Sequence, residues 1–315
     1  MKSQMILDIG GVSQWFGDNR VLHDIDLKVA PGQFVAMVGA SGCGKSTLLR
    51  AILGTVPPKE GTILADNHRV TGPTRHVGIV YQKYGLYQFL TAEQNVAFGL
   101  MLDQTEIWDR MMLWKWLPLR KRHLEEAREL LVRFRLEKAL CHYPRELSGG
   151  MQQRVAIAQA LIMKPRILLL DEPFGALDEA TREELQDMLL NLYAENLAAK
   201  REGQQPPWTV IIVTHELNEA FYVSDRVIGL SRNWYEGGWH EEEKSGKVLG
   251  ATKVWDKCAP VYHPGEPRNY ELFAEMKNQL RKTVLNDDAR SIDRYEHVSF
   301  WEDLKNGVGT GVAIA

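Results

Sequence analysis

The chain has 315 residues, of which 38 are basic and 41 acidic, so its formal net charge is −3. This balance argues against a protein whose main partner is nucleic acid, because such proteins usually carry a basic excess. The three scattered cysteines, Cys43, Cys141 and Cys258, are too few for a secreted disulfide framework and fit a reducing cytosol.

Short apolar runs alternate with turn signals along the chain. Strands are expected at Ile25–Val29, Phe34–Val38, Val77–Tyr81, Ile167–Leu170 and Thr209–Val213. Helices are expected at Lys45–Leu53, Thr91–Leu102, Leu124–Phe134, Gly149–Met163 and Glu179–Asn196. The last two strands are continuously apolar, as are strands buried on both faces. The pattern predicts an α/β fold with a largely parallel central sheet.

Three segments read as additions to this alternation, namely Asp103–Arg122, Arg201–Pro207 and Asn233–Gly246. The first is rich in Trp and Met and ends in three basic residues. That composition suits a membrane interface or a partner helix, and it also suits a loop that packs on its own domain.

The composition changes again from Lys247 onward. A strand is expected at Lys247–Trp255 and a helix at Tyr270–Leu285, joined by a Pro-rich link. The small residues Gly307–Ala315 are expected to fray. This part of the sequence has no ligand signature.

A glycine-rich loop carries the first chemical motif. Its residues match G-x-x-x-x-G-K-[ST] and are Gly39, Ala40, Ser41, Gly42, Cys43, Gly44, Lys45, Ser46 and Thr47. It lies between a predicted strand and a predicted helix, the context in which such a loop cradles phosphates with its backbone N–H groups. Lys45 is expected to reach the β- and γ-phosphates of ATP, and the Ser46 hydroxyl to bind Mg²⁺. A thiol reagent at Cys43 is expected to block hydrolysis.

Two carboxylates end the apolar strand Ile167–Leu170. Asp171 is placed to hold Mg²⁺ beside Ser46. Glu172 points elsewhere because side chains alternate along a strand, and it is expected to polarise the attacking water as a general base.

A further segment identifies a family. Leu147-Ser148-Gly149-Gly150-Met151-Gln152-Gln153-Arg154 resembles the signature motif of ABC ATPases, with Met151 at a position where Gln is more common. The resemblance implies a P-loop NTPase of ABC type, with a parallel-sheet core, an antiparallel β subdomain and a helical subdomain. On this basis residues 5–246 are the ATPase domain, with a helical subdomain at about 83–163 and an insert at 103–122. Residues 247–315 are a short C-terminal extension.

The resemblance also implies further site residues. Ser148, Gly149 and Gly150 would cap the γ-phosphate bound to a second copy, so that two ATPs lie between two domains. Gln82 would contact Mg²⁺ or the attacking water, and His215 would hold the γ-phosphate. Asp178 would cross to the partner's site. Phe16 would stack on adenine, with the adjacent Trp15 as the alternative.

Partners and location follow from the same resemblance. Met1–Gly11 lacks a secretory signal pattern, and no run approaches the roughly 18–20 apolar residues of a membrane span. We therefore expect a subunit on the cytoplasmic face of the membrane that pairs with a second ATPase subunit and transmembrane permease subunits. Residues Lys83–Leu90 would form the groove that receives the permease.

The motifs are similar to those of importers of nitrate, sulfonates and taurine, which also use a solute-binding protein. The alternatives are an ABC-type ATPase acting on ribosomes or DNA, and an export or lipid-transport subunit.

Overall fold

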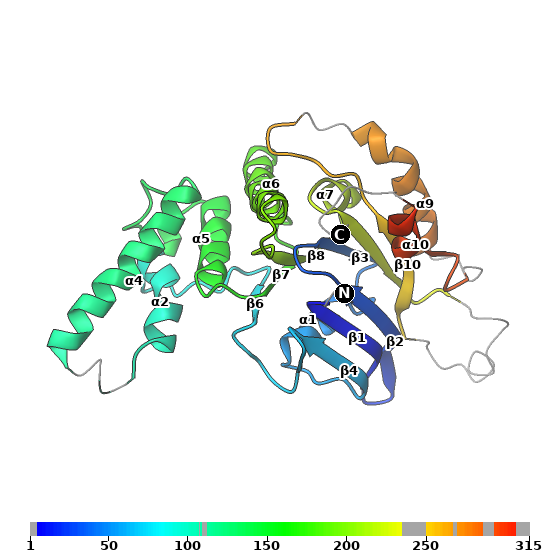
Figure 1. The fold of residues 1–315 in the computed structure, drawn as a ribbon, viewed down its shortest axis with the longest axis horizontal. Helices are drawn as coiled ribbons and strands as arrows, with labels where there is room; N and C mark the ends of the chain where they lie inside the picture. Colours follow the sequence, from blue (N-terminus) through cyan, green and yellow to red (C-terminus); the bar gives the residue numbers. More distant parts are fainter. Residues whose placement is uncertain are drawn as a thin grey trace.

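A seven-stranded sheet runs through the middle of the molecule (Figure 1). The computed structural model describes residues 5–106, 108, 112–234, 250–266, 270–285 and 293–306. The sheet has the order β11-β10-β9-β3-β8-β7-β6. Five consecutive strands, ending with β6 at one edge, run parallel, and they are β9 (Arg226–Ser231), β3 (Phe34–Gly39), β8 (Thr209–Val213), β7 (Ile167–Asp171) and β6 (Val77–Val80). The expected α/β fold with a largely parallel sheet is confirmed.

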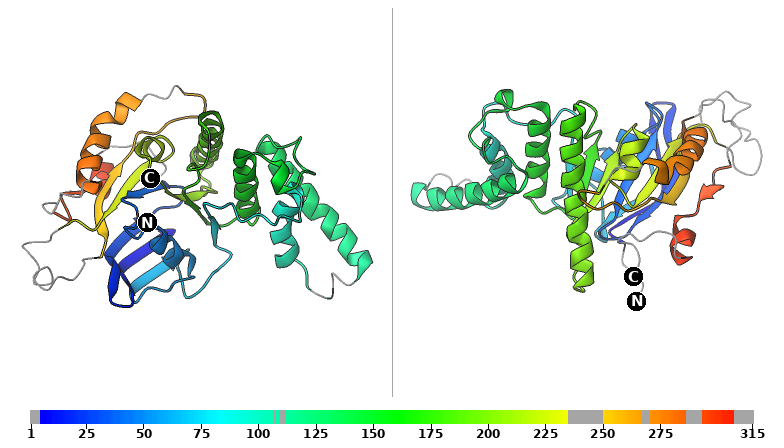
Figure 2. Two further views of the ribbon diagram at one scale, coloured as in Figure 1. Left: turned by 180° about the vertical axis from the view of Figure 1, so that it is seen from behind. Right: turned by 90° about the horizontal axis from the view of Figure 1, so that it is seen from above.

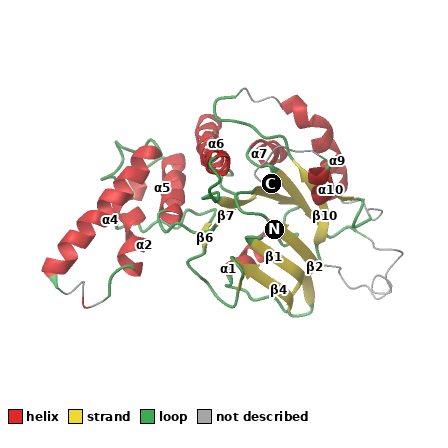
Figure 3. Cartoon of the chain, in the orientation of Figure 1, coloured by secondary structure: helices red, strands yellow, loops and turns green. Residues whose placement is uncertain are grey.

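Successive residues of β3 bury themselves on opposite faces of this sheet. Phe34, Ala36 and Val38 belong to one apolar core, and Val35 and Met37 belong to the other. Because both faces are covered, the strand carries apolar side chains throughout. Three helices cover the first face (Figures 1 and 3), namely α6 (Glu179–Arg201), α7 (Leu217–Tyr222) and α9 (Ala274–Val284).

An antiparallel sheet and helix α1 (Lys45–Leu53) cover the second face. The sheet has the order β2-β1-β4-β5, with strands β2 (Asn19–Val29), β1 (Leu7–Phe16), β4 (Glu60–Ala65) and β5 (His68–Arg69). Only the end of β2 was expected from the sequence. Strand β1 has register shifts around Gly10 and Gly11, and a Cβ at Gly61 would collide with the backbone oxygens of both. Because glycines in a sequence usually indicate turns, these strands are hard to recognise from sequence.

A helical unit stands apart at one end of the molecule (Figures 1 and 2). It contains α2 (Ala92–Asp103), α4 (Leu113–Arg133) and α5 (Gly149–Leu161), with a single 3-10 turn at Pro144–Glu146 before α5. Thr91 and Gln94 form a capping box that starts α2. Helix α4 begins eleven residues before the expected start at Leu124, so the second half of the insert is helical. Residues 107 and 109–111 of the insert lie outside the described ranges.

The C-terminal residues add strands to the main sheet. β10 (Thr252–Cys258) pairs antiparallel with β9, and β11 (His297–Val298) pairs in parallel with β10, before α10 (Phe300–Lys305). The expected helix at Tyr270–Leu285 is a 3-10 turn at Tyr270–Phe273 followed by α9. Residues 247–249, where the expected strand begins, and 307–315 fall outside the described ranges, as do most of 233–246.

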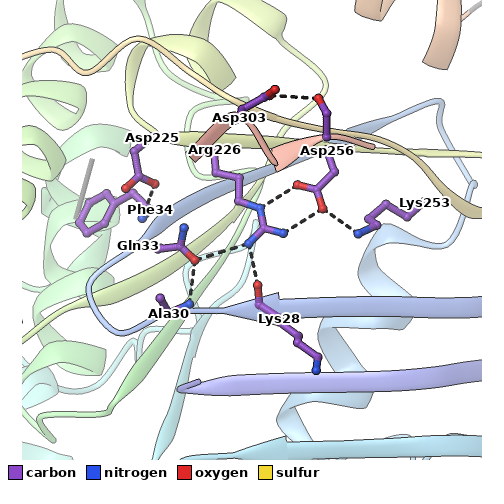
Figure 4. A network of polar contacts seen from close by, with 10 residues as sticks. Lys28, Ala30, Gln33, Phe34, Asp225, Arg226, Lys253, Asp256 and Asp303 are labelled. Carbon is purple, nitrogen blue, oxygen red and sulfur yellow. Dashed lines mark hydrogen bonds and ion pairs between the residues drawn. The ribbon is translucent and has the colours of Figure 1, made fainter. Parts of the chain in front are cut away.

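A buried ion pair joins this C-terminal part to the core (Figure 4). Arg226 donates from Nε and Nη2 to the two carboxylate oxygens of Asp256, at 2.7 and 2.8 Å. Lys253 Nζ lies 2.6 Å from the same carboxylate, and the Arg226 guanidinium covers the Phe300 ring. Burial alone would raise the pKa of Asp256, but the two cations hold it below its ordinary value. Two hydrogen bonds in a fixed fork make this join geometrically specific.

Candidate functional site

The glycine-rich loop joins the end of β3 to the start of α1. Gly42 and Gly44 have φ angles of 74° and 105°, which L side chains rarely adopt. Gly39 is restricted by space instead, because a Cβ there would lie 2.6 Å from the Leu230 carbonyl oxygen. Lys45 Nζ donates to the carbonyl oxygens of Gly39 and Ala40 at 2.7 and 3.0 Å. The loop therefore wraps around the Lys45 side chain and leads into a helix N-terminus. Backbone N–H groups at a helix N-terminus form an anion site.

A cavity of about 690 Å³ opens in front of this loop. Its lining residues come from separate parts of the chain and are Phe16, Val21, Ser41, Gly42, Gly44, Lys45, Ser46, Thr47, Glu172, His215 and Arg232. The size suits a drug-sized or nucleotide-sized ligand. Half of the expected site residues thus line one cavity.

The ends of three neighbouring strands bring the polar groups together. Gln82 follows β6, Glu172 follows β7 and His215 follows β8, and these strands lie side by side in parallel. Gln82 Nε2 donates to Glu172 Oε2 at 2.9 Å, and His215 Nδ1 lies 3.7 Å from Glu172 Oε1. One carboxylate is therefore fixed between an amide and an imidazole, at the carboxyl edge of a parallel sheet where such folds bind ligands.

Glu172 has an unusual backbone. Its φ of 48° lies in the left-handed region, which is uncommon for a residue with a side chain. Its N–H still donates to the Val213 carbonyl of the neighbouring strand at 2.9 Å. Residues held in such conformations cluster at functional sites, since the surrounding structure must over-determine them. Here the turn swings Glu172 out of the strand and into the cavity.

Asp171 lies at the end of β7 behind Glu172. Ser46 Oγ donates to Asp171 Oδ1 at 3.4 Å, so the expected pairing of these two residues is observed. Burial raises the pKa of Asp171, and the neighbouring charge of Glu172 raises it further. A cation at this position would relieve both effects.

The two adjacent aromatic residues at the end of β1 differ in placement. Phe16 lines the cavity and is 50% exposed, so its ring is free to receive a flat ligand. The Trp15 ring lies under the guanidinium of Arg20 at 4.7 Å. The geometry agrees with the choice of Phe16.

Cys43 differs from the sequence expectation. It belongs to the loop but not to the cavity wall, and it is only 3% exposed. Burial raises the pKa of its thiol, an effect that Lys45 opposes. The thiolate is the reactive form, so this cysteine is a poor target for a thiol reagent.

The signature residues lie away from the cavity of their own chain. Ser148 caps α5 by accepting from the N–H of Met151 at 3.3 Å, which leaves Gly149 and Gly150 in the first turn. Asp178 caps α6 by accepting from the N–H and hydroxyl of Thr181, and these hydrogen bonds lower its pKa. A Cβ on Gly150 would overlap the Cγ2 methyl of Thr181. The two caps thus meet through Thr181.

Two residues of the cavity were not expected. Arg232, one residue after β9, donates from Nη2 to the Gly42 carbonyl at 2.7 Å and adds a positive charge beside the loop. Val21 contributes apolar wall from β2. Neither belongs to a motif, and only the pairing of β9 with β3 brings Arg232 to the loop.

The chain is similar to transport proteins over most of its length. A family model described as ABC transporter matches residues 22–175. The aliphatic sulfonates import ATP-binding protein SsuB of Bacillus cereus is 40% identical over 91% of this chain and 97% of that protein. Its counterpart from Bacillus subtilis is 41% identical over 93% of each chain. The sulfate/thiosulfate import ATP-binding protein CysA of Synechocystis is 40% identical over 85% of this chain and 69% of that protein.

Solved structures show the same architecture. A dimeric structure of the ATP-binding cassette MJ0796 bound to ADP and Pi, in a post-hydrolysis state, has a TM-score of 0.56 and 32% identity to this chain. The match covers 70% of this chain and 93% of the MJ0796 chain. The ADP form of the cassette MJ1267 has a TM-score of 0.63 over 91% of this chain at 18% identity, which speaks for the fold.

Proposed function

Because the chain belongs to the ABC transporter family, as an ATPase subunit of the importer class, we propose that it drives uptake of an aliphatic sulfonate or a similar small anion. The observation that carries the chemistry is the fixed carboxylate of Glu172 between Gln82 and His215, next to the phosphate-binding loop. The substrate class rests on the names of the relatives that match over nine tenths of the chain.

Each group of the site has its own role in ATP hydrolysis. The backbone N–H groups of the loop and Lys45 hold the phosphates, and Phe16 stacks on the adenine. Water attacks the γ-phosphorus in line as the bond to the bridging oxygen breaks, and Glu172 accepts the proton of the water. Gln82 and His215 keep that carboxylate aimed, so little reorganisation is needed when the nucleophile arrives.

The oxygen donors at the loop fit Mg²⁺. Ser46 Oγ and Asp171 Oδ1 are hard ligands within 3.4 Å of each other, and Gln82 offers an amide oxygen nearby. Among the residues that the structure describes, no group of three or more His, Cys, Asp or Glu is placed so that it could hold a metal ion by itself. A site with one carboxylate suits Mg²⁺, which keeps waters and takes phosphate oxygens. When bound there, the ion would neutralise charge on the transferred phosphoryl group.

The complete site requires a second subunit. Ser148, Gly149, Gly150 and Asp178 lie outside the cavity of their own chain, and a helix N-terminus with bare N–H groups is an anion site. We infer that these groups close over the nucleotide of a second copy. The dimeric form of the similar cassette supports this arrangement.

Permease subunits would dock on the groove after Gln82. A cavity of about 410 Å³ there is lined by aromatic and small residues, among them Tyr81, Tyr84, Tyr87, Phe98 and Gly99. Apolar aromatic anchors of this kind dominate the energy of protein interfaces. Within the described residues, no helix is long and apolar enough to cross a bilayer. Because the relatives are import ATP-binding proteins, we propose that the subunit sits on the cytoplasmic face and that a solute-binding protein delivers the substrate from the other side.

Reconstitution tests the proposal. The chain is to be incorporated into vesicles with the permease and solute-binding protein of a sulfonate importer from the same organism, and uptake of radiolabelled sulfonate is to be measured with and without ATP. ATP-dependent accumulation inside the vesicles supports the proposal. ATP hydrolysis without uptake of any sulfonate, sulfate or nitrate would overturn the transport assignment, and copurification with ribosomes would favour the ribosomal alternative.

A further inference from the structure

Large apolar side chains are exposed shortly before α4 and in its first turns. Trp108, which precedes the helix, and Met112, Trp114 and Leu117 at its start are 69%, 40%, 75% and 58% exposed, and we call these four residues the α4 stripe. Soluble proteins rarely expose apolar side chains of this size in a group unless the group meets a partner or a membrane. We therefore expect the stripe to contact a membrane or another protein.

The stripe lies on the outer side of the helix. Trp116 and Arg120 face α2, where they line a cavity of about 310 Å³ with Phe98 and Leu102. At 3.6 residues per turn, Trp114 and Leu117 point to a different side from this pair. The first turns of α4 also project beyond the rest of the helical unit (Figures 1 and 2). The helical part of the stripe thus lies on a projecting end of the molecule.

Basic residues are interspersed with the stripe and follow it. Residues 112–122 contain four Lys or Arg and no Asp or Glu, which is a net charge of +4. The whole chain carries −3, so the remaining residues carry −7. Lys121 follows the stripe on the same side of α4 and its side chain is 79% exposed. Its contact with Glu125 is 3.8 Å long and exposed, and such surface pairs contribute little.

The position of the stripe fits a membrane surface. Phe98 and Leu102 line both the cavity under α4 and the aromatic groove that we propose for the permease. A permease seated in that groove would bring the bilayer close to the same part of the chain. Two tryptophans with adjacent basic residues are the usual equipment of a helix that lies in the headgroup region.

We propose that the α4 stripe and Lys121 rest on anionic phospholipid beside the permease, which extends the proposed function by a direct lipid contact. A permease segment is the weaker candidate, because protein interface cores are depleted in lysine. Anionic headgroups match the local charge of +4, and the tryptophans match the boundary between headgroups and acyl chains.

Vesicle sedimentation with the purified full chain tests this contact. Vesicles of phosphatidylcholine mixed with phosphatidylglycerol should bind the chain, and vesicles of phosphatidylcholine alone should bind it much more weakly. Lys121→Glu changes the local charge by two and should lower the partition coefficient roughly twentyfold. The double variant Trp114→Ser/Leu117→Ser should lower it at least about tenfold. Raised salt should weaken binding of the unaltered chain.

Matched controls lie at the other end of the same helix. Val132→Ser removes an exposed apolar side chain, and Lys138→Glu makes the same charge change just beyond α4. Both should bind vesicles like the unaltered chain, and all variants should keep its ATPase rate in solution. Equal binding to both kinds of vesicle, or unchanged binding by the stripe variants, would overturn the proposal.

The permease alternative gives a distinct result. Stripe variants that bind vesicles normally but fail to copurify with the permease would assign the stripe to that protein and refute the lipid contact. Loss of the proposed transport function leaves vesicle binding of the isolated chain intact, so the two proposals fail separately.

Discussion

The contact between Gly150 and Thr181 makes the signature helix sensitive to a single methyl group. Gly150→Ala would place a Cβ over the Thr181 Cγ2 methyl, 3.1 Å from Thr181 Cβ and 3.5 Å from Thr181 Oγ1. Overpacking of this kind costs about 1–3 kcal/mol. Alanine also favours a helix over glycine by up to about 1 kcal/mol, which offsets part of the loss. We expect Gly150→Ala to lower the free energy of unfolding by about 1–2 kcal/mol and to reduce ATPase activity by displacing α5.

A double-mutant cycle isolates this contact. Thr181→Ser removes the methyl group but keeps the hydroxyl that donates to Asp178. In that background Gly150→Ala should cost about 1–2 kcal/mol less than in the unaltered chain, measured by urea denaturation. Gly149→Ala is the control, because its Cβ would meet only the Tyr84 hydroxyl at 3.3 Å and a distant Leu177 atom. Equal costs of Gly150→Ala in both backgrounds would refute the packing argument.

Three further changes test other parts of the structure. Glu172→Gln should lower kcat by about 10²–10⁴ and leave an ATP-bound dimer on gel filtration, whereas the exposed Glu216→Gln should do neither; near-normal hydrolysis would remove Glu172 as the base. Mass spectrometry after brief treatment with a thiol reagent should find the exposed Cys141 modified before the buried Cys43, whose pKa is raised; the reverse order would contradict the placement of the loop. Burial raises the pKa of Asp225 to about 6, so the stability from its protonated form is complete below about pH 4 and is lost as the pH rises through 6. Asp225→Asn should therefore reduce the fall in unfolding free energy between about pH 5 and pH 8 by on the order of 1 kcal/mol; an unchanged pH profile would reject this assignment.

The central sheet could be predicted because its strands are buried on both faces. Ile167–Leu170 and Thr209–Val213 are continuous apolar runs, and they are β7 and β8 within a residue. The antiparallel sheet was expected from the family resemblance and is present, but most of its strands were not located in the sequence. β4 has a burial pattern with only two buried residues, and β1 is interrupted by Gly10 and Gly11, so neither shows a clear alternation. These segments form strands because they pair with neighbouring strands, and not because their own sequence pattern favours a strand.

Helix ends were predicted where a cap or glycine marks them. α1 begins after Gly44 and ends before Gly54, both in the left-handed conformation, and its bounds agree with the sequence. The helix expected at Leu124–Phe134 corresponds to the second half of α4, whose first half contains Pro118. Near the start of a long helix a proline removes one hydrogen bond, and the following turns continue undisturbed.

The site could be predicted for groups that occur in motifs. Ser46, Asp171 and Glu172 were identified from motifs, and Gln82 and His215 from the family resemblance. In the structure Ser46 contacts Asp171, and Glu172 contacts Gln82 and His215. Arg232 was missed because its place beside Gly42 depends on the order of strands in the sheet. The chemical state of Cys43 was missed because burial is a property of the fold.

The arrangement of strands and helices explains why the proposed site needs two chains. Every group that lines the cavity sits on the loop after β3, at the end of another strand or on the antiparallel sheet beside it, and these elements share one core. Ser148 and Asp178 instead start helices α5 and α6, and their caps meet through Thr181. That join holds both caps in one rigid surface away from the cavity. These two helix N-termini cannot reach the nucleotide bound by their own chain. They are suited to bind the nucleotide held by a second copy.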